Sequence, residues 1–184
     1  AMIGHIIQEN RNVPPFDGIH VNGSFKIFLT QSDRESVIVE ADENIIQYID
    51  TNVQNKILYI SSRSGFLNMN NQSTVYIDIK NLQQLDIAGA SSMIGQSNFN
   101  VSNLGIEIHG SSDLDLQLNG QSVNISISGS SDVVLAGNII NLSTNVSGSS
   151  KLNASCLEVI DADICILGAS SAKIKVRNRL GYNV

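Results

Sequence analysis

Residues 127–150 read ISGSSDVVLAGNIINLSTNVSGSS, a stretch in which the triplet Gly-Ser-Ser occurs twice. This triplet belongs to a broader pattern of five residues. A β-branched residue and any residue come first, Gly is third, either Ala or Ser is fourth, and Ser is fifth. The copies are IAGAS (87–91), IHGSS (108–112), ISGSS (127–131), VSGSS (146–150) and ILGAS (166–170). Their glycines are 21, 19, 19 and 20 residues apart, a near-constant period that is typical of a repeat protein.

Around each glycine, apolar residues occur at every second position. One copy has Val123, Ile125 and Ile127 before the glycine, and Val133 and Leu135 after it. A period of two predicts β-strands with one buried face. A unit of about twenty residues cannot bury that face alone, so the copies have to stack, with strands about 4.8 Å apart. The sequence therefore predicts an all-β fold, a right-handed parallel β-helix with coils of about 20 residues.

The repeated triplet itself suits a corner of such a helix. Glycine tolerates the left-handed backbone that a tight corner requires. The serine that ends each copy can hydrogen-bond to the backbone of its own turn and to the neighbouring coils. We therefore expect a structural ladder at one corner, with the members Gly89, Gly110, Gly129, Gly148, Gly168, Ser91, Ser112, Ser131, Ser150 and Ser170.

The 184 residues are expected to form a single domain over 13–184, in three parts. Residues 81–176 hold the five repeats and 177–184 form a basic C-terminal tail. Residues 13–80 are rich in strand patterns and are expected to close one end of the β-helix, because an open end exposes strand edges. Turn residues and alternation place a helical turn at 42–47 and strands at 17–21, 25–31, 36–41, 48–53, 56–61 and 74–80.

Charge and composition exclude some classes of function. Eleven Lys and Arg against seventeen Asp and Glu give a net charge of −6, which argues against a nucleic acid or an anionic membrane surface as partner. Apolar runs are too short for a membrane-spanning helix, and the first residues lack the basic region of a signal peptide. Cys156 and Cys165 fit no disulfide framework or metal motif, so we expect both to be buried.

Two features together resemble a known family. One is the opening FDGIHVNGSFKIFLTQ, followed by VIVEADENIIQYIDTNV and ILYIS; the other is the series of Gly-Ser turns. They resemble the autotransporter-adhesin head GIN domain of bacterial surface proteins, common among gut Bacteroidetes, over about residues 15–176. In that family the turn often reads Gly-Ser-Gly-Asp, whereas here Ser replaces the second Gly in all five copies.

The resemblance implies a β-helix similar to that of pectate lyases, without a recognised catalytic set. It also implies export to the cell surface, outer membrane or periplasm, often as a lipoprotein, and a role in adhesion.

One short stretch contains the residue types of a hydrolase triad: His109, Ser111, Ser112 and Asp113. These residues follow one another along a strand and a corner, so alternate side chains point apart. A nucleophile, a base and an orienting acid have to converge within hydrogen-bond reach. The sequence therefore predicts no catalytic residues here.

Asp113 and Asp132 occupy equivalent places one coil apart, and Asp115 lies nearby. They are the candidate ligands for a Ca²⁺ ion. Because Ca²⁺ takes six to eight oxygen ligands, three carboxylates are too few, and we predict no metal and no cofactor.

We therefore expect a non-enzymatic surface or envelope protein, an adhesin or a binding or structural module, with a glycan or a protein as partner. The alternatives are an inert scaffold in a larger envelope assembly and a pectate-lyase-like carbohydrate-active enzyme. The enzyme needs acids for Ca²⁺ and a basic residue in one groove, and residues 81–150 contain no Lys or Arg. The largest pocket is expected near the N-terminal segment or the polar loop 64–73, away from the Gly-Ser-Ser corners.

Overall fold

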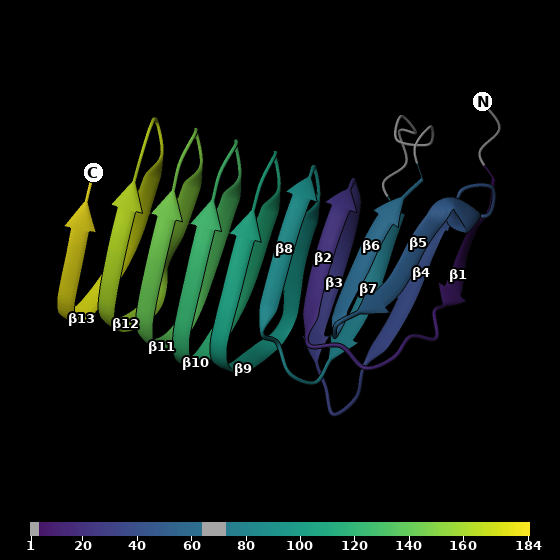
Figure 1. The fold of residues 1–184 in the computed structure, drawn as a ribbon, viewed down its shortest axis with the longest axis horizontal. Helices are drawn as coiled ribbons and strands as arrows, with labels where there is room; N and C mark the ends of the chain where they lie inside the picture. The colour runs from purple at the N-terminus through teal and green to yellow at the C-terminus, as the bar shows by residue number, and fades with distance from the viewer. Residues whose placement is uncertain (1–3, 64–72) are drawn as a thin grey trace.

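The computed structural model describes residues 4–63 and 73–184. The described residues form one 13-stranded sheet that winds along the long axis of the molecule (Figure 1). The elements are β1 (Ile6–Asn10), β2 (Gly18–Gly23), β3 (Phe25–Gln31), β4 (Ser36–Asp42), the 3₁₀ turn η1 (Ile46–Tyr48), β5 (Ile49–Gln54), β6 (Ile57–Ser62), β7 (Ser73–Ile79), β8 (Gln84–Gly89), β9 (Ser92–Ile108), β10 (Asp113–Ile127), β11 (Asp132–Val146), β12 (Lys151–Ile166) and β13 (Ser171–Asn183).

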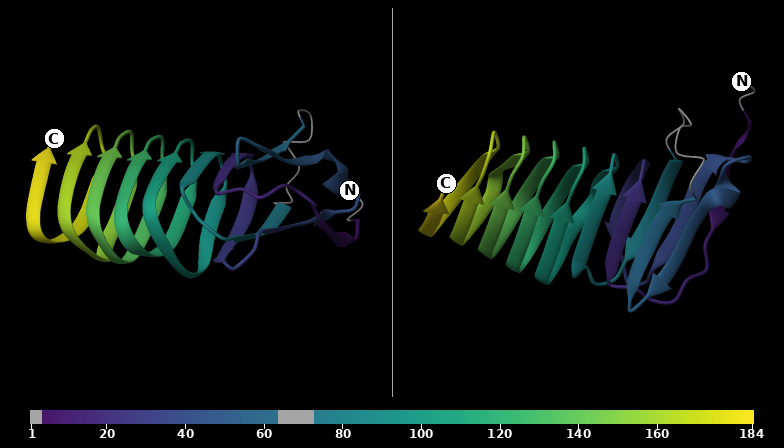
Figure 2. Two further views of the ribbon diagram at one scale, coloured as in Figure 1. Left: turned by 60° about the horizontal axis from the view of Figure 1, so that its bottom comes forward. Right: turned by 45° about the horizontal axis from the view of Figure 1, so that its top comes forward.

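The C-terminal part is a regular solenoid. Each of the strands β9 to β13 runs along one side of the molecule, bends at its middle and returns along the other side (Figure 2). We call the first halves of these strands the first face and the second halves the second face. Successive strands pair in parallel and in register, from Asp113 opposite Asp132 to Ile127 opposite Val146 between β10 and β11. The predicted β-helix with coils of about 20 residues is confirmed.

Inward side chains form columns between the two faces. Ile125, for example, lies in register between Ile106 on β9 and Thr144 on β11, and only 2% of its surface is exposed. Asp115, in the outward phase, is exposed. Full burial of an aliphatic side chain contributes about 1.5–3 kcal/mol. Because each column extends through neighbouring coils, the coils stabilise one another rather than folding separately.

The N-terminal strands β2 to β7 begin and end within two residues of their predicted positions, and η1 lies at the end of the predicted helical turn. Their place in the stack differs from the expectation. β2 pairs in parallel with both β6 and β8, and β3 pairs in parallel with both β7 and β9. β2 and β3 therefore lie inside the stack, with β6 and β7 on one side and β8 and β9 on the other (Figure 1).

The end of the stack is formed by antiparallel strands. β4 pairs with β7, β1 pairs with β4, and β5 pairs with β6, all antiparallel. We expected the whole of residues 13–80 to close this end. In the structure, β4 and β5 do so together with β1, and β1 is a strand that the sequence analysis did not predict.

The expectation that both cysteines are buried is wrong, because Cys156 is exposed and Cys165 is half-buried. β12 carries one more residue than β11 where Ala154 and Ser155 lie opposite Leu135, and this bulge shifts the alternation. Cys156 consequently faces outward. Cys165 lies in the outward phase opposite Asn145.

No helix in residues 4–63 and 73–184 is both long enough and apolar enough to cross a membrane.

Candidate functional site

The last serine of each Gly-Ser-Ser or Gly-Ala-Ser corner belongs to a hydrogen-bonded ladder between coils. Ser150 is typical: its Oγ accepts the N–H of Ser131 at 3.2 Å and donates to the carbonyl of Gly129 at 3.2 Å. Ser112, Ser131 and Ser150 have no exposed surface. Because these hydroxyls are engaged and buried, the ladder connects coils and does not present a row of hydroxyls to a ligand.

The glycine of each corner adopts a left-handed backbone. Gly148 has φ of +75°, and a Cβ atom built on it would lie 2.5 Å from the carbonyl oxygen of Gly129 in the preceding coil. Close stacking of the corners and the positive φ therefore both require glycine.

A sixth corner lies at VNGSF (21–25), where Phe25 takes the place of the serine. The Oγ of Ser91 donates to the carbonyl of Gly23 at 2.9 Å and accepts the N–H of Phe25 at 3.1 Å. A search for a period near twenty misses this copy, because Gly23 is 66 residues from Gly89.

The structure does not bring together the residue types of the hydrolase triad. Ser112 is buried in the ladder, whereas the side chain of His109 is 55% exposed. His109 instead contacts Ser128 of the next coil, with Nδ1 2.8 Å from its Oγ, and its Nε2 lies 3.9 Å from a carboxylate oxygen of Glu107. These contacts lie on an exposed surface.

Asp113 and Asp132 are in-register partners on β10 and β11, as their sequence positions suggest. The next partner of Asp132 is Lys151, and Asp115 lies opposite Val134. In the part of the chain that the structure describes, no group of three or more His, Cys, Asp or Glu side chains is arranged to hold a metal ion.

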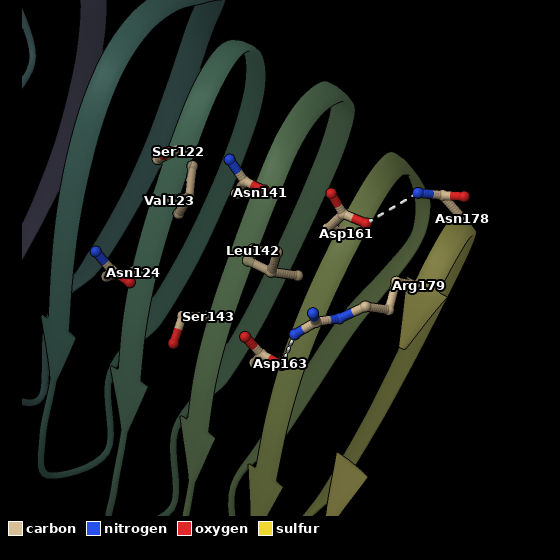
Figure 3. A pocket seen from close by; sticks show the side chains of 10 residues that line it. All are labelled: Ser122, Val123, Asn124, Asn141, Leu142, Ser143, Asp161, Asp163, Asn178 and Arg179. Atoms are coloured by element: carbon tan, nitrogen blue, oxygen red, sulfur yellow. Dashed lines mark hydrogen bonds and ion pairs between the residues drawn. The ribbon is translucent and has the colours of Figure 1, made fainter. Parts of the chain in front are cut away.

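A polar hollow of about 540 Å³ lies on the second face, over β10 to β13 (Figure 3). Its outward side chains form two rows along the solenoid axis. One row is Ser122, Asn141 and Asp161, and the other is Asn124, Ser143 and Asp163. Between the rows, Val123 and Leu142 belong to the buried core, and Figure 3 shows these side chains on successive coils.

A bulge in β13 forms the end of the hollow. Arg177 and Asn178 together lie opposite the single residue Ile160 of β12. Bulges of this kind redirect side chains. Here, Asn178 donates through Nδ2 to Oδ1 of Asp161 at 3.3 Å, as Figure 3 shows.

A second cross-strand contact lies beside this hydrogen bond. Nη2 of Arg179 lies 3.6 Å from Oδ1 of Asp163. The two side chains are 72% and 68% exposed, so the pair contributes at most about 1 kcal/mol to stability. Its effect is to hold the carboxylate of Asp163 and the guanidinium of Arg179 beside one another at the edge of the hollow (Figure 3).

Two exposed isoleucines lie next in sequence to residues of the hollow, on neighbouring coils. Ile140 and Ile160 immediately precede Asn141 and Asp161, and they are 43% and 39% exposed. A second hollow of about 140 Å³ lies between them and the Glu158–Arg177 ion pair, whose charged atoms are 3.8 Å apart. We call Ile140 and Ile160 the isoleucine rim; they line the smaller hollow, which neighbours the larger, polar one in sequence.

Sequence reasoning did not single out this site. The Asp-x-Asp pattern at 161–163 is visible in the sequence and matches that at 113–115, but alternation alone does not show which pair borders a hollow. We expected the largest pocket near the N-terminal segment or the loop 64–73. Residues 64–72 of that loop lie outside the described residues. The hollow of about 540 Å³ lies instead on the C-terminal coils.

The ten residues that line the hollow supply carboxylates, amides, hydroxyls and one guanidinium group. This set can donate and accept hydrogen bonds in close succession. It also contains two serines but no histidine or lysine.

Several solved structures share this fold. A crystal structure described as a "putative adhesin" from Parabacteroides merdae ATCC 43184 has a TM-score of 0.82 and 18% identity, covering 98% of this chain and 80% of that chain. A second "putative adhesin", from Bacteroides fragilis NCTC 9343, has a TM-score of 0.78 and 19% identity, covering 98% and 94%. A structure described as a "putative lipid binding protein" from Parabacteroides distasonis ATCC 8503 has a TM-score of 0.71 and 19% identity, covering 98% and 96%.

No curated protein matches the chain by sequence. A family model does, over residues 15–184, which include all the repeats and the strands β2 to β8. That model is described as "Putative auto-transporter adhesin, head GIN domain". Because the match covers more than half of the chain, this protein belongs to the head GIN domain family that the model describes.

Proposed function

We propose that the protein is a non-enzymatic binding module that is exported to the cell surface or envelope and mediates adhesion. Membership of the head GIN domain family supports this role, and two structures of similar fold are described as a "putative adhesin". The observation that carries the proposal is the outer surface of the second face. Short polar side chains stand there in rows on strands that pair residue for residue, so the surface is rigid and repetitive.

A rigid row of short polar groups makes many individually weak contacts. Useful affinity then comes from several copies acting together, because each further contact is made at a high effective concentration. We therefore expect weak binding by a monomer and much stronger binding by a clustered protein.

The test compares a monomer with a streptavidin-bound tetramer of the biotinylated protein on cultured intestinal epithelial cells, measured by flow cytometry. We expect the tetramer to bind with an apparent affinity at least about 100-fold higher than the monomer. Tetramer binding no greater than that of streptavidin alone would argue against an adhesive role.

The compartment is tested separately. The complete gene, with its own N-terminus and an internal epitope tag, is expressed in its native host. Protease added to intact cells should remove the tag if the module is displayed outside, and a tag that is protected until the cells are lysed would contradict surface display.

One observation favours a second candidate, a pectate-lyase-like enzyme. Asp161, Asp163 and Arg179 bring two acids and one basic residue into one hollow, which is the combination such an enzyme requires. The guanidinium is already beside Asp163, and two carboxylates are few for a Ca²⁺ ion. We expect no release of unsaturated products from polygalacturonate with added Ca²⁺, and activity that disappears in Asp163→Asn would favour the enzyme.

A further inference from the structure

We propose that the hollow on the second face, together with its isoleucine rim, is a binding site for a neutral glycan chain lying along the solenoid axis. This inference rests on the proposed adhesive function. It specifies where on the protein the ligand binds and to which chemical class the ligand belongs.

The arrangement of polar groups matches a linear polymer of sugars. Each coil contributes one pair of outward side chains, such as Asn141 with Ser143 or Asp161 with Asp163, and the pairs recur at the coil spacing of about 4.8 Å. This spacing is close to the length of one hexopyranose unit in an extended chain. A glycan parallel to the axis can therefore present successive sugars to successive pairs.

The chemistry of the lining suits hydroxyl groups. A sugar hydroxyl both donates and accepts, and here carboxylates that only accept lie beside a guanidinium that only donates. Asp161 and Asp163 each have a partner on β13 that holds one carboxylate oxygen, at 3.3 Å from Asn178 and 3.6 Å from Arg179. These exposed contacts favour one orientation of each carboxylate, and a ligand can replace them with hydrogen bonds of its own.

The rim supplies the apolar contact that a sugar ring also needs. A pyranose ring is polar at its edge, but its C–H faces are apolar. Ile140 and Ile160 are exposed on adjacent coils, each directly preceding a polar residue of the hollow. A sugar that bonds to Asn141 or Asp161 can therefore cover part of the neighbouring isoleucine.

Charge selects neutral over anionic glycans. The lining carries two carboxylates and one guanidinium, and the protein as a whole carries a net charge of −6. Uronic acids and sulfated sugars would be repelled by this field.

The experiment is a titration of the ¹⁵N-labelled protein with four neutral hexasaccharides (maltohexaose, cellohexaose, mannohexaose and chitohexaose) and with hexagalacturonate, followed by NMR. We expect at least one neutral hexasaccharide to bind at millimolar concentration. Its chemical-shift changes should be concentrated at residues 122–124, 141–143, 161–163 and 178–179. Hexagalacturonate should bind at least tenfold more weakly.

The chain offers a matched control. The double variant Asp161→Ala/Asp163→Ala removes the acid pair of the hollow and should weaken binding at least tenfold. The double variant Asp113→Ala/Asp115→Ala removes an equally spaced, exposed acid pair from the first face and should leave binding unchanged. The single change Ile160→Ser should also weaken binding, because it removes part of the apolar rim. Circular dichroism of each variant checks that the solenoid remains folded.

The proposal is overturned if no neutral hexasaccharide binds, if the shifts map to the first face, or if the two double variants weaken binding equally. Stronger binding of hexagalacturonate would also overturn it. The result is independent of the test of adhesion. If the tetramer still adheres to cells after Asp161→Ala/Asp163→Ala, the adhesive function stands and this site is refuted. If the unaltered tetramer does not adhere, adhesion is refuted, and the titration still decides whether the hollow binds a glycan.

Discussion

Thr144 is a hydroxyl-bearing residue in an otherwise aliphatic column. It lies in register between Ile125 and Ile164 and is 2% exposed. Within the described residues, its Oγ1 has no hydrogen-bond partner. A buried polar atom that bonds to nothing costs about 1–3 kcal/mol.

Thr144→Val should therefore stabilise the protein by about 1 kcal/mol, since valine keeps the shape and removes the hydroxyl. Urea unfolding measures the change in the free energy of unfolding. The matched control is Thr30→Val on the outward side of β3, which should change stability by less than about 0.5 kcal/mol. A loss of stability in Thr144→Val would indicate that the hydroxyl is bonded, for example to a buried water.

Gly148→Ala should destabilise the protein by more than about 1 kcal/mol. The added Cβ would lie 2.5 Å from the carbonyl oxygen of Gly129, and alanine also disfavours φ of +75°. The neighbouring change Ser149→Ala, at an exposed position of the same corner, serves as the control and should be nearly neutral. Equal melting temperatures for the two variants would show that the corner can relax around a side chain.

At the scale of elements, each repeat is a unit that contacts mainly the coil before it and the coil after it. Because the strands pair in parallel and in register, equivalent residues of neighbouring coils lie opposite one another. The bulges in β12 and β13 interrupt this residue-for-residue pairing locally. They place Cys156 on the surface and aim Asn178 at Asp161.

Deletion of residues 129–147 should leave a shorter folded solenoid, because β10 can then stack on β12 with the same inward phase. Deletion of residues 129–138 alone should prevent folding, since the chain would re-enter halfway around a coil and the downstream columns would lose their register. Circular dichroism and thermal melting distinguish the two. If both proteins unfold alike, the repeats do not behave as modular units.

At the scale of the whole molecule, stability should fall from the middle of the stack toward its ends. β10 and β11 each pair with strands on both sides, whereas β1 pairs only with β4 and β13 only with β12. An edge strand also buries less of its surface, and every residue of β1 is exposed.

We therefore expect amide hydrogen exchange, followed by mass spectrometry, to be slowest in β10 and β11 and fastest in β1 and β13. Exchange in β13 as slow as that in β11 would mean that its outer edge is covered in solution. Repeating the measurement at several protein concentrations would show whether a second copy provides the cover.

The sequence alone determined the strand pattern, the coil length and the phase of the side chains away from the bulges. These properties are local: a period of two decides which side of a strand is apolar, as at Ile125, and a glycine decides where the chain can turn, as at Gly148. The family resemblance followed from the same local features.

Only the tertiary structure decided how distant segments meet. β2 and β3 lie between the pair β6 and β7 and the pair β8 and β9. This arrangement depends on which order of strands buries the apolar columns, and the order along the chain does not specify it. The candidate site has the same origin. Asp161 and Asp163 meet Asn178 and Arg179 because β13 carries one extra residue opposite Ile160. The position of such a bulge is set by pairing between coils, which alternation along a single strand does not record.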